Sequence, residues 1–151
     1  MELPMRRINL EVESKLSHVS LVAVAIRAIS IHAGLDPGNA SQTELSVVEA
    51  VTNVITHAYL GQPDQRILVT VSYDSELLRF DLYDSGKLMP AETIDRLVRG
   101  RGIVESENLE LASIPESGRG LGIIHRTMDE IFYERDGDRN HLQLTRRIHQ
   151  R

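Results

Sequence analysis

Glu49-Ala50-Val51-Thr52-Asn53 lies in a stretch of helical periodicity, where it places a carboxylate and a carboxamide one turn apart. Two further segments follow along the chain. Asp84-Ser85-Gly86 comes at the end of an alternating apolar stretch, and Gly118-Arg119-Gly120-Leu121-Gly122 precedes an apolar one. We interpret the three, in this order, as parts of a nucleotide pocket: a polar helix face, an acidic turn and a glycine-rich loop that opens a helix.

The polar face of the first helix is well defined. At 100° per residue, Ser46, Glu49, Asn53 and His57 fall within an arc of about 80°. Most other positions between 47 and 58 are apolar, which predicts a largely buried helix. A carboxylate on such a helix needs a partner or a cavity, because burying an unpaired charge is costly. The alternative is that this face meets ordinary solvent.

The acidic turn and the glycine segment can each be interpreted in two ways, as part of a ligand site or as an ordinary turn. Asp84 could accept a hydrogen bond from an exocyclic amine such as that of adenine, with Gly86 letting the backbone pass close to the base. Asp-x-Gly is also a common turn. Glycines at a helix start expose N–H groups to phosphate, although a flexible turn has the same composition. The segment lacks the Gly-Lys-Ser/Thr of a P-loop.

Period-two and helical patterns alternate along the rest of the chain, and they predict a two-layer α/β sandwich, a mixed sheet with helices on one face. The expected helices start with one that ends at Gly34 and one that Ser41 and Glu44 begin as a capping box. The loop from 100 to 117 is long enough to be functional. The expected strands are 7–13, 66–73, 77–83, 131–135 and 140–148, and the expected helices are 15–33, 41–60, 90–98 and 120–130.

Composition excludes several classes of function. The 151 residues carry a net charge of −5, which argues against a nucleic-acid-binding surface. The chain contains no cysteine, which excludes disulfides and thiolate ligands and suits the cytoplasm. No uninterrupted apolar run reaches the length of about 18 residues that a membrane span needs, and the start lacks the apolar run of a signal peptide. We therefore expect no direct contact with nucleic acid or membrane.

Together the three segments resemble the GHKL ATPase superfamily, whose Bergerat fold binds ATP between a helix, an Asp-x-Gly turn and a glycine-rich box. Residues 49–59, Glu-Ala-Val-Thr-Asn-Val-Ile-Thr-His-Ala-Tyr, are similar to the corresponding helix of the anti-sigma-factor serine kinases. Met128-Asp129-Glu130-Ile131 is similar to that group as well. The resemblance covers nearly the whole chain. It implies one ATP-binding kinase domain over 1–151, with an ATP lid at about 88–117.

The resemblance implies a role for each matching residue. Asn53 would coordinate the Mg²⁺ on ATP, Glu49 would be the general base, and Asp84 would bind the adenine amine with Gly86 beside the base. His57 would form part of the pocket wall. The phosphates would be held by Gly118, Arg119, Gly120, Leu121 and Gly122.

Two segments depart from the family pattern. Lys87-Leu88-Met89-Pro90 stands where the family often has a further glycine, and Gly118 stands where an arginine is common. The resemblance implies an ATP- and Mg²⁺-dependent serine/threonine-protein kinase that acts as an anti-sigma factor in partner switching. Its partners would be a STAS-type anti-sigma-factor antagonist and a sigma factor. It would form a homodimer, with strand 8–12 and the following helix as contact elements.

Two other functions stay open at this point. One is a partner-switching module that binds nucleotide without transferring phosphate, which the two departures favour. The other is a histidine-kinase-like catalytic domain that acts on a histidine.

Overall fold

The computed structural model describes residues 4–100 and 116–148, so most of the expected loop at 100–117 and much of the expected lid lie outside the described part. The strands and helices follow the sequence prediction closely in kind and order. They are β1 (Arg6–Glu13), a 3-10 turn (Leu16–His18), α1 (Val19–Ala33), α2 (Pro37–Asn53), a π-helical turn (Val54–Ala58), β2 (Arg66–Tyr73), β3 (Leu77–Asp84), α3 (Ala91–Arg99), α4 (Glu116–Thr127), β4 (Glu130–Asp136) and β5 (Arg139–Arg147).

The strands form one sheet in the order β1-β2-β3-β5-β4, and every pairing in it is antiparallel. The expectation of a mixed sheet is therefore wrong. Antiparallel strands can be joined by a short hairpin, whereas parallel strands need a longer crossover connection. Here β1 and β2 are joined through the pair α1 and α2, and the hairpins β2–β3 and β4–β5 reverse directly.

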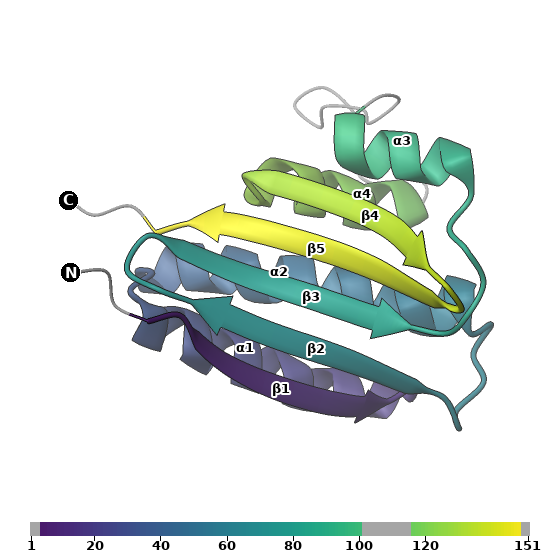
Figure 1. Cartoon of the computed structure of the whole chain (residues 1–151), viewed down its shortest axis with the longest axis horizontal. Helices are drawn as coiled ribbons and strands as arrows, with labels where there is room; N and C mark the ends of the chain where they lie inside the picture. The colour runs from purple at the N-terminus through teal and green to yellow at the C-terminus, as the bar shows by residue number, and fades with distance from the viewer. Residues whose placement is uncertain (1–3, 101–115, 149–151) are drawn as a thin grey trace.

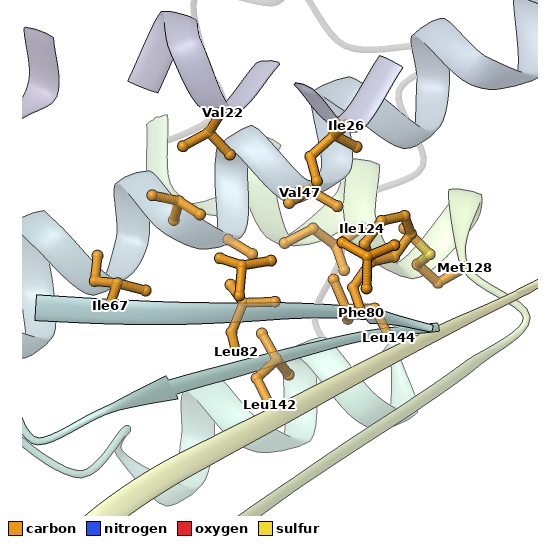
Figure 2. Close-up of a cluster of buried hydrophobic side chains, with 14 of the residues drawn as sticks. Val22, Ile26, Val47, Ile67, Phe80, Leu82, Ile124, Met128, Leu142 and Leu144 are labelled. Carbon is orange, nitrogen blue, oxygen red and sulfur yellow. The ribbon is translucent and has the colours of Figure 1, made fainter. Parts of the chain in front are cut away.

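The two-layer α/β sandwich is confirmed. Figure 1 shows α1, α2 and α4 on one face of the sheet, with the opposite face uncovered. The core lies between the layers, where Figure 2 shows Val22 and Ile26 of α1 and Val47 of α2 above Phe80 and Leu82 of β3. These side chains come from residues at helical spacing and from alternate strand positions, the two periods that predicted the elements.

Helix α2 starts five residues earlier than the capping box at Ser41 indicates. Asp36 is the N-cap, because its side chain accepts a hydrogen bond of 2.9 Å from the backbone N–H of Asn39. Pro37 occupies the first helical position, where its missing N–H and fixed φ cost nothing. Pro37 thus both follows the end of α1 at Gly34 and starts α2, which leaves Ser41 inside the helix.

Helix α4 starts at Glu116, so the glycine segment lies inside the helix rather than in a loop before it. An α-helix leaves only its first four N–H groups without an intrahelical acceptor. The amide of Gly118 belongs to that first turn, whereas those of Gly120 and Gly122 donate along the helix. The helix ends at Thr127 instead of near residue 130, since β4 begins at Glu130.

Among the described residues, Leu16–Ala33 is the one helical stretch whose length and composition, with a mean hydropathy of 1.5, would suffice to cross a membrane. This result qualifies the expectation that the chain has no membrane-spanning segment. It is weak support for a membrane span, because the core helix of a globular protein passes the same test. In this fold Val22 and Ile26 of that stretch belong to the core.

Candidate nucleotide site

A cavity of about 360 Å³ opens between α2, α4 and the ends of β3 and β5. This volume lies in the range typical of small-molecule sites. Its walls are mainly apolar, with Val54 from the π-helical turn, Leu121 and Ile124 from α4, and Leu142 from β5. Such walls suit a flat aromatic ring. Polar groups reach the cavity from Asn53, His57, Asp84, Lys87, Thr93, Arg96 and Tyr133.

Strand alternation brings Asp84 to this cavity. Leu78, Phe80 and Leu82 of β3 point to the helices, and Asp84 continues the same row as the last residue of the strand. Its partner across the sheet is Asn140, which opens the corresponding row of β5. An acid in the row that faces the helices cannot reach bulk solvent freely, and Asp84 is 7% exposed.

The Asp84 carboxylate is held firmly in place. Its Oδ1 accepts hydrogen bonds of 2.9 Å from the Asn140 side-chain amide and 2.9 Å from the Gly86 backbone N–H. Burial raises the pKa of Asp84 above its ordinary value, while those two hydrogen bonds and the charge of Arg135 oppose the rise. Asp84 is therefore a fixed acceptor at the wall of the cavity, as its predicted role requires.

The turn after Asp84 lies directly on the π-helical turn. A β-carbon at Gly86 would lie 2.6 Å from the backbone oxygen of Ala58, so only glycine fits this contact. The Lys87 N–H donates to the same Ala58 oxygen at 2.9 Å. The Tyr59 hydroxyl accepts from the Ser85 N–H at 2.8 Å and donates to the Arg66 carbonyl at 2.7 Å. Burial raises the pKa of Tyr59, which keeps this hydroxyl protonated and able to donate.

Helix α2 places Asn53 in the wall of the cavity and Glu49 one turn earlier, half-buried against α4. The chain then widens into the π-helical turn, a feature often found at functional sites. That turn carries His57, which also lines the cavity. The predicted polar face of this helix is thus partly a cavity wall, and the alternative of simple solvent exposure does not describe Asn53.

The glycine segment meets α2 rather than the cavity itself. A β-carbon at Gly120 would lie 2.5 Å from Oε2 of Glu49, so this glycine leaves the space that the carboxylate occupies. Of residues 119–122, only Leu121 lines the cavity. Gly122 is buried in α4, and Arg119 is half-buried in its first turn.

Several contributors were not predicted from the sequence. Asn140 supports Asp84, Tyr59 supports the following turn, and the Tyr133 hydroxyl accepts from the Met89 N–H at 3.0 Å. Their contacts join positions 26 to 56 residues apart, so no local pattern shows them. One signal was available for Asn140, because it is a polar residue in the row that Leu142 and Leu144 continue.

Helix α3 also contributes Thr93, Arg96 and Leu97 to the cavity. Leu97 is buried, and its carbonyl lies 3.1 Å from Nδ1 of His125 on α4. Since a carbonyl can only accept, that ring nitrogen carries the proton. Part of the predicted lid is therefore a helix docked on α4. Gly100 ends it in the left-handed conformation, where its missing side chain makes room for the same histidine.

The donor set fits ATP and is consistent with Mg²⁺. A buried carboxylate acceptor beside apolar walls suits the amine of adenine, and Lys87 and Arg96 place positive charge at the cavity. Within the described residues, no group of three or more His, Asp or Glu side chains could bind a metal by itself. Mg²⁺ commonly takes one or two protein oxygens together with substrate phosphates and water, and Asn53 offers one such oxygen.

The fold and the cavity define an ATP-binding α/β sandwich, and comparison with known proteins places it in a family. The family model of the histidine kinase-like ATPase domain matches residues 12–146. The chain belongs to this family, which confirms the GHKL assignment made from the three segments. ATP is the nucleotide that the family description implies.

Similarity to individual proteins narrows the relationship. The chain is 27% identical over 125 residues to the serine-protein kinase RsbW of Listeria monocytogenes serovar 1/2a, covering 83% of this chain and 77% of the relative. It is 31% identical over 125 residues to the anti-sigma F factor of Halalkalibacterium halodurans, covering 82% and 79%. These relatives connect the chain to the partner-switching kinases of the family.

A solved structure supports the fold. The chain superposes with a TM-score of 0.63 on a crystal structure of the RsbU and RsbW domains of a Mycobacterium tuberculosis protein, at 14% identity. The match covers 95% of this chain and 33% of that chain, so the chain spans about a third of that protein's length. At this identity the likeness concerns the fold alone.

Proposed function

We propose that this protein is an ATP- and Mg²⁺-dependent serine/threonine-protein kinase that phosphorylates a STAS-type anti-sigma-factor antagonist and acts as an anti-sigma factor. One observation carries the proposal. Asp84, Asn53 and Leu121, from three distant segments, line one cavity, and Glu49 lies against the glycine segment at Gly120. The named relatives, serine-protein kinases and an anti-sigma factor, support the same reaction class.

The residues then have separate tasks. Asp84 accepts a hydrogen bond from the adenine amine, while the cavity walls exclude water from the ring. Asn53 would supply an oxygen to Mg²⁺, which would neutralise charge on the phosphates. The antagonist's hydroxyl oxygen forms a bond to the γ-phosphorus, the bond to the β,γ-bridging oxygen breaks, and Glu49 takes the hydroxyl proton. The amides in the first turn of α4 are available to phosphate oxygens.

A nucleotide-binding module without transfer activity is the second candidate. Two observations favour it. The amides of Gly120 and Gly122 lie within helix α4, where they donate along the helix instead of toward a ligand. The segment after Gly86 also departs from the family pattern. In this function, nucleotide would bind and determine which protein partner docks, and ADP would not accumulate.

We also propose that the kinase pairs with a second copy through β1 and α1. The outward residues Leu21 and Val24 of α1 are each 69% exposed, and Ile8 of β1 is 40% exposed. Exposed apolar side chains are often found at protein interfaces. Light scattering coupled to size-exclusion chromatography measures the mass directly, and a monomer at micromolar concentration would contradict the dimer.

Calorimetric titration with ATP, with and without Mg²⁺, tests the site. Asn53→Ala should weaken Mg-ATP binding by at least about tenfold, because it removes the carboxamide oxygen. Glu49→Gln should leave ATP binding within about threefold and lower phosphate transfer to a STAS-type protein by about 100-fold or more, the range of a lost general base. Glu44→Gln, on the same helix, is the matched control.

The outcomes separate the two candidates. Binding with transfer that Glu49→Gln abolishes supports the kinase. Binding without transfer to any STAS-type protein supports the second candidate. Full transfer activity in Glu49→Gln would overturn the general-base role. A folded wild-type protein that binds no ATP would overturn both.

A further inference from the structure

Asn140 lies behind Asp84 as seen from the cavity. It is 1% exposed, it pairs with Asp84 across β3 and β5, and it is absent from the cavity wall. Its side-chain nitrogen donates to Asp84 Oδ1 at 2.9 Å, to the Gly86 carbonyl at 3.1 Å and to the Lys87 carbonyl at 3.1 Å. One buried amide thus contacts both the acid and the turn that follows it.

The orientation of this amide is determined by its neighbours. Three acceptors surround the nitrogen, and the other atom, Oδ1, accepts from Arg135 Nη1 at 3.2 Å. Rotating the amide by 180° would place an oxygen against three oxygens and leave the guanidinium facing an NH₂ group. Only one arrangement satisfies all of these contacts, so Asn140 acts on Asp84 as a donor.

The donor contacts leave one oxygen of Asp84 for a ligand. Oδ1 already accepts from Asn140 and from the Gly86 N–H. Within the part of the chain that the structure describes, no hydrogen bond to Oδ2 is recorded. A carboxylate held through Oδ1 in this way has a fixed rotation about its side-chain bond, and it presents Oδ2 as an acceptor.

We infer that Asn140 is a positioning residue for base recognition, which holds Asp84 as an acceptor that pairs with an exocyclic amine and rejects an exocyclic carbonyl oxygen at the same place. The inference rests on the proposed binding of ATP at this cavity. Asn140 itself contributes no group to the base. It acts through Asp84 and through the carbonyls of Gly86 and Lys87.

The charges around Asp84 agree with this role. Burial raises the pKa of Asp84, and the Asn140 hydrogen bond is the largest contribution that opposes it. Without Asn140 the acid would be more readily protonated, and a protonated carboxyl can also donate to an exocyclic carbonyl oxygen. The titratable and charged side chains nearby are Tyr59 on the π-helical turn, Tyr133 and Arg135 on β4, and His57, Lys87 and Arg96 at the cavity.

The test compares ATP with inosine triphosphate, which carries an oxygen where ATP carries the amine. Wild type should bind ATP at least about tenfold more tightly, the discrimination expected when one hydrogen bond to a charged group is lost. Asn140→Leu, similar in size but without donors, should reduce this ratio to about threefold or less. Asn140→Thr keeps one donor and should give an intermediate ratio. Thr145→Val, at another buried position on β5, should keep the wild-type ratio.

The ratio separates positioning from a general loss of structure, because destabilisation weakens the binding of both nucleotides alike. If Asn140→Leu kept the wild-type preference for ATP over inosine triphosphate, the role of Asn140 would be overturned, while the proposed ATP binding would stand. If the wild-type protein bound ATP and inosine triphosphate equally well, the inference would also be overturned, since Asp84 would not distinguish the amine from the oxygen. If wild type bound no ATP at all, the proposed function would fail and this inference with it.

A second variant keeps the test decisive if Asn140→Leu does not fold. Asn140→Asp replaces the amide by a carboxyl group of the same shape. At pH 5 the pair can share a proton, which restores the donor, whereas at pH 8 two negative charges would face each other. The preference for ATP over inosine triphosphate should therefore be larger at pH 5 than at pH 8 in this variant. A preference that did not change with pH would overturn the inference.

Discussion

Two glycines in the site are conspicuously crowded, and their neighbours differ in kind. A β-carbon at Gly86 would lie 2.6 Å from the carbonyl oxygen of Ala58, and one at Gly120 would lie 2.5 Å from the carboxylate of Glu49. The first neighbour is backbone within a packed turn. The second is the end of a flexible side chain. An added methyl group should therefore disturb the packing of the backbone at Gly86. At Gly120 it should disturb only the position of the Glu49 carboxylate, and with it the proposed chemistry.

The two sides are held together differently. At Gly86, the turn is tied by hydrogen bonds that involve Ala58, Tyr59 and Asn140, from two other parts of the chain. At Gly120, one helix lies against another, and the contact depends on a carboxylate that can rotate. The comparison indicates that the base side is fixed by the fold, whereas the phosphate side leaves room for movement.

Gly86→Ala is expected to have the largest effect on stability. The backbone of Ala58 cannot move away without breaking the bond from the Lys87 N–H, so overpacking should cost about 1–3 kcal/mol. For a chain of this size each kcal/mol lowers Tm by about 2–4 °C. ATP affinity should fall as well, because the turn carries Asp84. Thermal unfolding and calorimetric titration measure the two effects.

Gly61→Asn is the control for that comparison. Gly61 has a positive φ of 77°, a conformation that asparagine tolerates, and nothing lies within 4 Å of an added β-carbon. This variant should unfold within about 0.5 kcal/mol of wild type, as surface substitutions usually do. If Gly86→Ala were equally harmless, the base side would not be the rigid one.

Asp84→Asn should change the free energy of unfolding by an intermediate amount, and it should stabilise the folded protein. Burial raises the pKa of Asp84 in the folded state, so the wild-type protein loses stability as pH rises through that value. Asparagine keeps an acceptor for Asn140 and Gly86 but carries no charge. Its gain should be present at pH 8 and should vanish below about pH 3, where the wild-type acid is protonated in both states.

Unfolding measured at the two pH values, together with ATP titration, checks this prediction. The variant should bind ATP at least about tenfold more weakly despite its higher stability. A gain of equal size at both pH values would show that the charge is not its cause. Retained ATP affinity would show that the amine is not read by this carboxylate.

Gly120→Ala should change stability least. Alanine in a helix interior gains about 0.5–1 kcal/mol over glycine, and this gain offsets the crowding against Glu49. The free energy of unfolding should therefore stay within about 1 kcal/mol of wild type. Phosphate transfer should nonetheless fall by about 10-fold or more, since the carboxylate must leave its position. A large drop in Tm would mean that the contact is structural and would weaken the comparison.

Periodicity and turn chemistry predicted most elements, because these are properties of neighbouring residues. The alternation in β2 and β3 and the glycine after α1 placed those boundaries to within a residue or two. The start of α2 was wrong because two capping signals compete within six residues. The pair Asp36-Pro37 prevails over Ser41, since an N-cap followed by proline begins a helix without losing a hydrogen bond.

The start of α4 was wrong for a different reason. Glycine disfavours a helix by about 1 kcal/mol at each position, so Gly118, Gly120 and Gly122 predict a loop locally. Packing of α4 against α2 and α3 overrides that preference, with Leu121 and Ile124 buried between the layers. Propensity alone could not show this, because the compensating contacts lie far away in the sequence.

The sequence by itself determined the composition of the site: a carboxylate and a carboxamide on one helix, an acid closing a strand, and a glycine segment next to another helix. These follow from residue type and local spacing. Only the tertiary structure decided that Asn140 holds Asp84, that Ala58 requires glycine at position 86, and that Gly120 makes room for Glu49. Each of these is a contact between distant segments, and strand register and helix packing, set by the whole core, fix which atoms meet.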